Sequence, residues 1–146
     1  MKQQEIFDAA AAHLMGMDGP SLDKDGDGCV YRGEDLDGCY NGQMCAVGLF
    51  IADEHYSPNL EGSGITGSQS VADAVAASWG QDDLTYDQVS LLADLQIAHD
   101  DTSSGITVKA FKTASDLSTW SRDIVAALDG VATKFHLRFD PKGVSA

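Results

Sequence analysis

The stretch from Thr85 to His99 reads Thr-Tyr-Asp-Gln-Val-Ser-Leu-Leu-Ala-Asp-Leu-Gln-Ile-Ala-His. Residues at intervals of three and four place an apolar stripe and one histidine on a single helical face: Val89, Leu92, Leu95 and His99. Thr85 and Gln88 have the spacing of a capping box, in which two residues satisfy each other's backbone N–H groups at a helix start. The stretch therefore predicts an amphipathic helix over 86–99.

Three further segments carry apolar residues at helical spacing, and they predict helices over 3–16, 70–79 and about 116–136. Their expected core positions are Ile6, Phe7, Ala10, Ala11, Leu14, Val71, Val75, Trp79, Leu117, Trp120, Ile124, Leu128, Val131 and Phe135. Together with the helix over 86–99, they indicate a mainly helical chain.

The remaining apolar segments predict a small amount of strand. Cys29–Arg32 is expected to form a short strand, paired with Gln43–Met44 across a glycine-rich turn at 33–42. Cys45–Ala52 is apolar enough for a short buried helix or strand, and a helix that begins near Cys45 is favoured. The fold class is therefore α+β, a mainly helical single domain over 1–137 with a small β-hairpin, and the tail 138–146 is expected to be flexible.

Acidic residues dominate the charge of the chain. The 146 residues include 9 Lys and Arg against 23 Asp and Glu, a formal net charge of −14, and Arg32 is followed by no Lys or Arg before Lys109. A nucleic acid or an anionic membrane surface requires clustered cations, so neither is an expected partner. Solubility, cation binding and mimicry of a nucleic-acid surface are the interpretations left open.

The N-terminus and the cysteines indicate a cytoplasmic protein with reduced thiols. Glu5 and Asp8 interrupt the apolar residues that a signal peptide would need. The three cysteines, Cys29, Cys39 and Cys45, are an odd number and include no Cys-x-x-Cys pair. Together with His55 they would supply the four ligands of a zinc site. Reduced cysteines are the default expectation in that compartment.

Residues 23–34 read Asp-Lys-Asp-Gly-Asp-Gly-Cys-Val-Tyr-Arg-Gly-Glu, which matches the EF-hand calcium loop at every ligand position. The expected oxygen ligands are the side chains of Asp23, Asp25, Asp27 and Glu34 and the carbonyl of Cys29. Pro20 before the loop and the glycines after it do not suit the flanking helices of an EF-hand. Two interpretations therefore stay open, a Ca²⁺ site and an acidic turn that leads into a strand; no cofactor is required.

Between residues 27 and 101 the chain carries a series of motifs in a specific order. They read Cys29-x-Tyr31-Arg32, Cys45-Ala46-Val47-Gly48-x-x-Ile51-x-Asp53-x-x-Tyr56-x-Pro58, Glu61-Gly62 and Leu92-x-x-Leu95-Gln96-x-x-His99-Asp100. In these motifs the chain resembles a family of small, mostly uncharacterised proteins of bacteriophages and prophages. The chain departs from that pattern in the insert 34–42, in Cys39 and in the segment 103–115. The resemblance implies a phage setting, in the cytoplasm of the host cell, and no particular reaction.

Several polar residues of these motifs predict a ligand site. The candidate ligand-binding residues are Tyr31, Arg32, Cys45, Tyr56, Glu61, Gln96, His99 and Asp100. A helix that begins near Cys45 would point free amides at an anion, and Arg32 would pair with a phosphate. The competing interpretation is structural: Arg32 pairs with Asp53 or Glu61, and His99 and Gln96 satisfy buried backbone groups.

A thiol hydrolase is the enzymatic alternative, with Cys45 as nucleophile and His99 as base. It requires a lowered pKa of Cys45 at a helix start. Asp100 is a poor candidate to orient His99, since adjacent helical residues point in different directions. Catalytic residues are therefore not expected.

The leading hypothesis is a phage-type accessory protein, with a role in counter-defence, that binds or sequesters a small nucleotide-like ligand without chemistry. A Ca²⁺-binding module and an acidic inhibitor that grips a host protein are the alternatives, and each leaves room for a homo-oligomer.

Overall fold

The computed structural model describes all residues of the chain except 18, 23–28, 36, 104–113 and 143–146. Its elements, in chain order, are α1 (Gln3–Gly16), β1 (Arg32–Glu34), β2 (Tyr40–Met44), α2 (Gln69–Ser78), α3 (Tyr86–Ser103) and α4 (Ala114–Phe135). Three short 3₁₀ helices lie between β2 and α2: Gly48–Phe50, Asp53–His55 and Pro58–Leu60. The mainly helical α+β single domain with a two-stranded antiparallel hairpin is confirmed.

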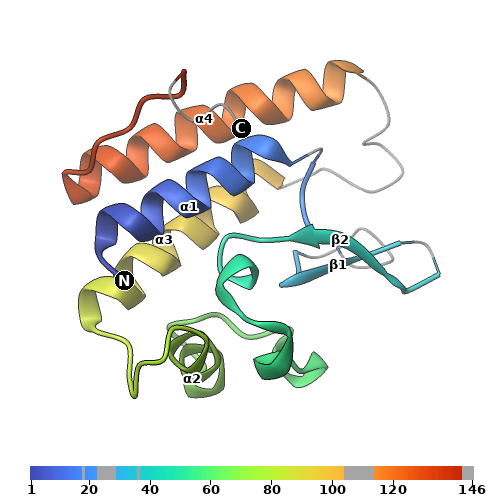
Figure 1. The fold of residues 1–146 in the computed structure, drawn as a ribbon. Helices are drawn as coiled ribbons and strands as arrows, with labels where there is room; N and C mark the ends of the chain where they lie inside the picture. Colours follow the sequence, from blue (N-terminus) through green and yellow to red (C-terminus); the bar gives the residue numbers. More distant parts are fainter. Residues whose placement is uncertain (18, 23–28, 36, 104–113, 143–146) are drawn as a thin grey trace.

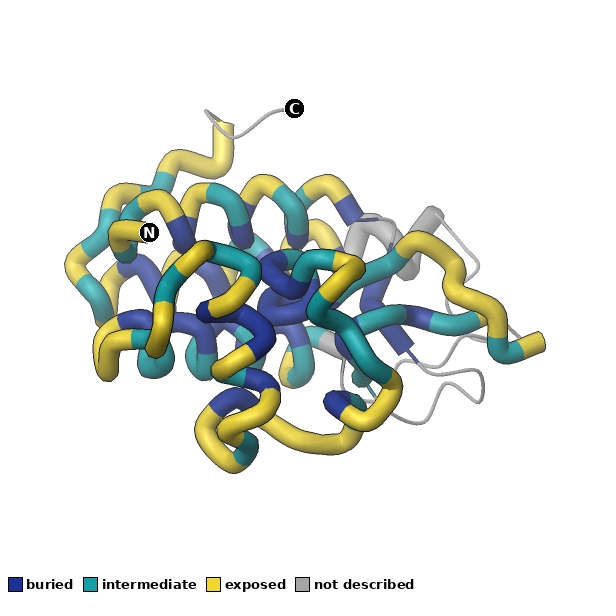
Figure 2. The backbone as a smooth tube through the Cα atoms, turned by 60° about the horizontal axis from the view of Figure 1, so that its bottom comes forward, coloured by how far each residue is buried: buried dark blue, intermediate teal, exposed yellow. Residues whose placement is uncertain are grey.

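Helices α1, α3 and α4 pack against one another as a layered bundle, and the hairpin, the 3₁₀ segments and α2 lie on one side of it (Figure 1). Buried positions follow the inward faces of these helices, whereas their outward faces are exposed (Figure 2). The largest fully buried side chains include Trp120, Phe7 and Leu92, one from each helix of the bundle. The core is therefore built where the three amphipathic helices meet.

The capping box at the start of α3 is formed as predicted. The backbone N–H of Thr85 donates to Oε1 of Gln88 at 2.9 Å, and the backbone N–H of Gln88 donates to Oγ1 of Thr85 at 3.1 Å. The helix continues four residues beyond the predicted end, to Ser103. The cap fixes where α3 begins, and so it fixes which α3 residues reach the far end of the bundle.

The predicted core is largely confirmed. All five predicted residues of α1 are fully buried, and in α4 the side chains of Trp120, Ile124, Leu128 and Val131 are buried. In α3 the predicted Val89 is only half-buried, while Leu91 is fully buried. Because α3 packs on both α1 and α4, its buried face is wider than a single stripe. The side chain of Leu117 lies outside the described residues.

The hairpin forms later in the chain than predicted. Arg32 pairs with Met44, and the first strand continues to Glu34 rather than beginning at Cys29. Cys29 instead forms an isolated antiparallel bridge with Leu22. The N–H of Val30 donates to the carbonyl of Ser21, whereas the Glu61 side chain, and not a neighbouring strand, accepts the N–H groups of Tyr31 and Arg32.

The segment Cys45–Ala52 is not the short helix that its composition predicts. It begins with a turn and contains only the 3₁₀ helix Gly48–Phe50. The N–H groups that would open a helix are taken by side chains: Sγ of Cys45 accepts from Gly48 at 3.3 Å, and Oε1 of Gln96 accepts from Val47 at 3.2 Å. Consequently the amides of Val47 and Gly48 are not free to bind an anion.

The end of the chain contacts the bundle. The ring of Phe139 packs edge-on against Phe7 with 5.4 Å between centroids, and the N–H of Arg138 donates to Oε1 of Gln4 at 3.0 Å. These contacts join the start of the tail 138–146 to α1, and the flexibility of the tail stays a prediction; 143–146 lie outside the described residues. Within the part of the chain that the structure describes, no helix combines the length and the apolar character needed to cross a membrane.

Candidate functional site

A cavity of about 250 Å³ opens between the approach to β1, the turn after β2, the loop at 61–64 and the last turns of α3. Its lining includes Cys29, Tyr31, Cys45, Glu61, Gln96 and Asp100. Five of the eight ligand-binding residues predicted from the sequence thus reach one cavity, although they are spread over four segments of the chain. The other three, Arg32, Tyr56 and His99, are not among its lining residues.

A chain of hydrogen bonds fixes the α3 wall of this cavity. Nε2 of Gln96 donates to Oδ1 of Asp100 at 2.5 Å, and Nδ1 of His99 lies 3.0 Å from the same oxygen. The backbone N–H of Ser21 donates to Nε2 of His99 at 3.1 Å. Gln96 is itself fixed, since its Oε1 accepts from Val47. Three segments that are distant in sequence therefore hold one carboxylate in place.

The direction of these bonds determines the state of His99. A backbone N–H can only donate, so Nε2 of His99 is an acceptor and its ring proton sits on Nδ1. That proton is donated to Asp100, and the fully buried ring packs edge-on against Trp120 at 5.7 Å between centroids. The expectation that adjacent residues of a helix would not contact each other is wrong here. His99 is a positioning residue for Asp100, rather than a base that faces the cavity.

Glu61 lies between this cavity and a second one. Its Oε1 accepts from the N–H of Tyr31 at 2.8 Å, and its Oε2 accepts from the N–H of Arg32 at 3.2 Å and from the hydroxyl of Tyr56 at 2.8 Å. The Glu61 carboxylate thus accepts the backbone N–H groups of Tyr31 and Arg32, a role that a neighbouring strand would otherwise have. Its acceptor sites are largely occupied by the protein itself.

Arg32 belongs to the second cleft, of about 330 Å³, which is also lined by Glu34, Tyr40, Tyr56 and Glu61. Its NH2 group pairs with Oδ1 of the exposed Asp53 at 2.6 Å, and its guanidinium carbon lies 4.3 Å from the ring centroid of Tyr56 and 5.5 Å from that of Tyr40. The predicted ligand-binding residues therefore divide between two adjoining clefts that share Glu61, except for the buried His99, which is in neither lining.

The thiol and the phenol of the first cavity are protonated at neutral pH. Burial raises the pKa of Cys45 to about 12, the opposite of the lowered pKa that a nucleophile at a helix start would have. Burial also raises the pKa of Tyr31, whose hydroxyl donates to the carbonyl of Ser63. An inert thiol at Cys45, together with a His99 whose two nitrogens are engaged, does not fit the thiol hydrolase arrangement.

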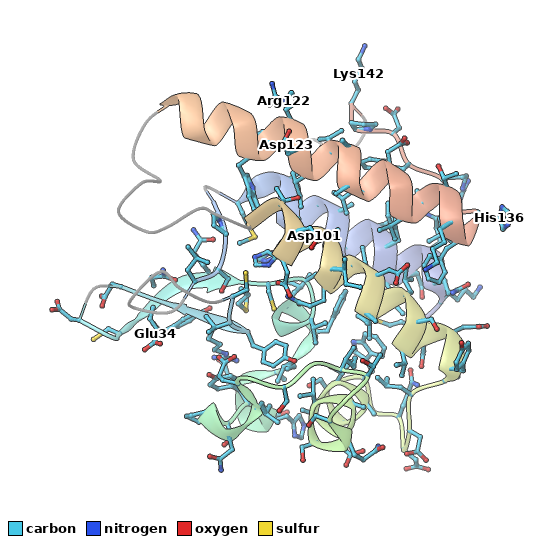
Figure 3. The ribbon with its side chains drawn as sticks, turned by 180° about the vertical axis from the view of Figure 1, so that it is seen from behind. Glu34, Asp101, Arg122, Asp123, His136 and Lys142 are labelled. Atoms are coloured by element: carbon cyan, nitrogen blue, oxygen red, sulfur yellow. The ribbon has the colours of Figure 1, made fainter. Side chains whose placement is uncertain are left out.

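The described residues include the end of the predicted Ca²⁺ loop, 29–34. Asp23, Asp25 and Asp27 lie outside the described residues. Glu34 is in β1, with its N–H donating to the carbonyl of Leu22 at 2.8 Å, and Figure 3 shows it on the hairpin. In an EF-hand the last ligand belongs to a helix. The described flank of this loop therefore favours the acidic turn that leads into a strand.

The cysteines do not gather with His55 into the zinc set that their number allows. No disulfide joins the cysteines within the described part of the chain, where Cys29 is half-buried, Cys39 exposed and Cys45 buried. Among the described residues, the group with metal-ligand spacing is Cys29, His99 and Asp100, whose ligand atoms lie within 4.8 Å of one another. A metal on Nδ1 of His99 would have to displace the proton donated to Asp100, while Ser21 keeps Nε2 an acceptor. The cluster is better explained by its hydrogen bonds.

Sequence reasoning missed two contributors to the cavity region. Cys29 was expected to serve a metal through its carbonyl, yet it lines the cavity. Ser21, which fixes His99, carries no signal in the sequence because it acts through its backbone N–H. Cys29 could have been grouped with the cavity, since it lies in the same short motif as Tyr31 and Arg32.

Comparisons of the chain with protein-family models, with curated proteins and with solved structures found no match. The inference of function therefore depends on the chemistry of the two clefts.

Proposed function

We propose that this protein binds a small, nucleotide-like ligand without catalysing a reaction on it. The observation that carries the proposal is the cavity at Asp100, where residues from four segments converge and a hydrogen-bond chain through Gln96 and His99 fixes the wall. Polar groups that are held in place around a cavity are the usual composition of a ligand site. Here they include a buried histidine, which a fold rarely places in its core without a role or a partner.

The size of the two clefts supports a ligand with two parts. A cavity of about 250 Å³ is smaller than the range of roughly 300–1,000 Å³ for drug-sized ligands. It therefore suits a fragment such as a nucleobase, and the remainder of the ligand would occupy the adjoining cleft. There Arg32 offers a guanidinium, now paired with the exposed Asp53, and two tyrosine rings. A phosphate that replaced the Asp53 carboxylate would keep the charge of Arg32 compensated.

The biological setting follows from the resemblance to phage proteins. A small phage accessory protein that holds a nucleotide-like molecule without chemistry would lower the free concentration of that molecule in the host. Sequestration of a host signal, as a form of counter-defence, is the role that we propose for this binding.

Thermal-shift measurements of the full chain with nucleosides, nucleotides and cyclic nucleotides test the proposal. We expect at least one phosphorylated compound to raise the melting temperature, and Arg32→Ala to reduce that shift. Arg122→Ala is the matched control, since its side chain is exposed and pairs with its neighbour Asp123. Native mass spectrometry of the protein from its expression host provides a second readout. If no compound shifts the melting temperature and no small molecule copurifies, the proposal is wrong.

A further inference from the structure

The lining of the first cavity restricts what can occupy it, provided that the proposed binding function is correct. We propose that the part of the ligand inside this cavity is a group rich in N–H donors, and that Asp100 receives it. The chemistry is that of a guanidinium or amine, or of the amino-bearing edge of a nucleobase.

Within the described part of the chain, hydrogen bonds reach only one of the two carboxylate oxygens of Asp100. Its Oδ1 accepts from Gln96 and is bonded to His99, whereas its Oδ2 accepts no hydrogen bond from the described residues. The side chain is 45% exposed at the cavity wall. Because Oδ1 is held by two donors, the position of Oδ2 is fixed before a ligand arrives. A preorganised charged acceptor of this kind favours a ligand that brings the donor.

The other lining residues make an anion unfavourable in this cavity. The lining residues that the structure describes include the carboxylates of Asp100 and Glu61, and no Lys, Arg or His side chain is among them. The donors of Glu61 come from Tyr31, Arg32 and Tyr56, so Glu61 adds negative charge to the cavity but little free acceptor capacity. A phosphate or carboxylate placed here would meet two like charges, with no compensating cation among the described lining residues.

The thiol and the phenol of the lining do not change this preference. The Cys45 thiol is protonated and buried, and the Tyr31 hydroxyl already donates to Ser63. Neither provides the positive charge that an anion would need. The cavity and the Arg32 cleft therefore differ in the chemistry they accept: N–H donors in the first and an anion in the second.

Isothermal titration calorimetry of the full chain tests this selection in two arms. The first arm uses guanosine and inosine, which differ only by the exocyclic amino group, and the corresponding 5′-monophosphates. The second arm uses agmatine and methylguanidine, which carry the guanidinium without a base. We expect binding in one arm. If the N–H donor belongs to a nucleobase, guanosine or its monophosphate should bind about tenfold or more tightly than the corresponding inosine compound.

Two variants at neighbouring positions of α3 provide the control. Asp100→Asn keeps the shape of the side chain but places an N–H₂ group on one side, and we expect it to weaken binding by about tenfold or more. Asp101→Asn should leave binding unchanged, because Asp101 is exposed and is not part of the cavity lining (Figure 3). Circular dichroism confirms that both variants are folded, and Asp100→Glu, which keeps the carboxylate, should retain part of the affinity.

The outcomes separate this inference from the proposed function. If a nucleotide binds equally well to the unmodified chain and to Asp100→Asn, and guanosine and inosine compounds bind alike, the inference is overturned while the proposed function stands. If none of the compounds in either arm binds and the nucleotide panel above gives no thermal shift, the proposed function fails with it.

Discussion

The two halves of this molecule, which share the last turns of α3, are held together by different forces. The bundle of α1, α3 and α4 depends on apolar side chains that meet at the centre of the domain. The polar junction, which we define as residues 20–22, 29–32, 45–48, 61–64 and 96–100, depends on directional hydrogen bonds between few partners. Apolar contacts are numerous and interchangeable, whereas each hydrogen bond of the junction has one acceptor. We therefore expect the halves to respond differently to substitution.

The largest effect is expected in the bundle. Leu92 of α3 is fully buried, so Leu92→Ala should lower the free energy of unfolding by about 2–5 kcal/mol through lost burial and a residual cavity. Urea denaturation measures this change. Ile97→Ala, on the same helix, is the control: with Ile97 54% exposed, its truncation should cost much less. Similar losses in both variants would contradict the position of α3 in the core.

The bundle is also the half that the sequence predicts well. Its signal is local, because apolar residues three and four positions apart identify both a helix and its buried face. The bounds of α1 and the cap at Thr85 and Gln88 agree with the structure for this reason. The departures, such as Leu91 buried instead of Val89, arise where α3 contacts two helices at once.

A smaller loss is expected at the polar junction. Glu61→Gln replaces one acceptor oxygen by an N–H₂ group, although the carboxylate accepts from Tyr31, Arg32 and Tyr56. At least one of these donors would then lack its acceptor, at a cost of about 1–3 kcal/mol. The free energy of unfolding from urea titrations measures it. Glu54→Gln is the matched control at a side chain that is largely exposed, and a loss no greater than in this control would show that Glu61 does not hold the start of β1.

The residues of the polar junction could be predicted from the sequence, but their arrangement in space could not. Tyr31, Glu61, Gln96 and Asp100 have side chains that a core does not need, and this made them candidates. Their grouping depends on contacts between positions far apart in the chain, such as the bond of Ser21 to His99 across 78 residues. No local period encodes such a contact. The position of Arg32 outside the first cavity also depends on such contacts, namely the hydrogen bonds that Glu61 accepts from Tyr31, Arg32 and Tyr56.

The capping box at the start of α3 offers a test with an effect between that of Glu61→Gln and the pH effect below. Its Thr85 side chain lies outside the hydrophobic core and the polar junction. Thr85→Ala removes the hydroxyl that accepts from the N–H of Gln88, and a lost cap costs about 0.5–2 kcal/mol. Thermal unfolding followed by circular dichroism detects the change. Thr133→Ala serves as the control, because Thr133 is an exposed residue inside α4. Equal melting temperatures for the two variants would mean that the capping box does not contribute to stability.

The smallest effect concerns pH and the contact between the two halves. His13 of α1 lies 2.7 Å through Nε2 from the carbonyl of Met44 at the end of β2. Burial lowers the pKa of His13 below its ordinary value of 6.5, and the hydrogen bond to the Met44 carbonyl opposes this only in part.

The unfolded chain therefore binds this proton more readily than the folded one, and stability should fall as the pH drops through 6.5. Urea titrations between pH 7.5 and 5 measure the slope. His13→Gln keeps a side-chain N–H for the Met44 carbonyl but does not titrate, so it should flatten the profile over this range, whereas His136→Gln, at an exposed position, should not. If His13→Gln keeps the slope of the unmodified chain, the pH dependence comes from elsewhere, and the contact of α1 with the hairpin is not where the two halves are coupled.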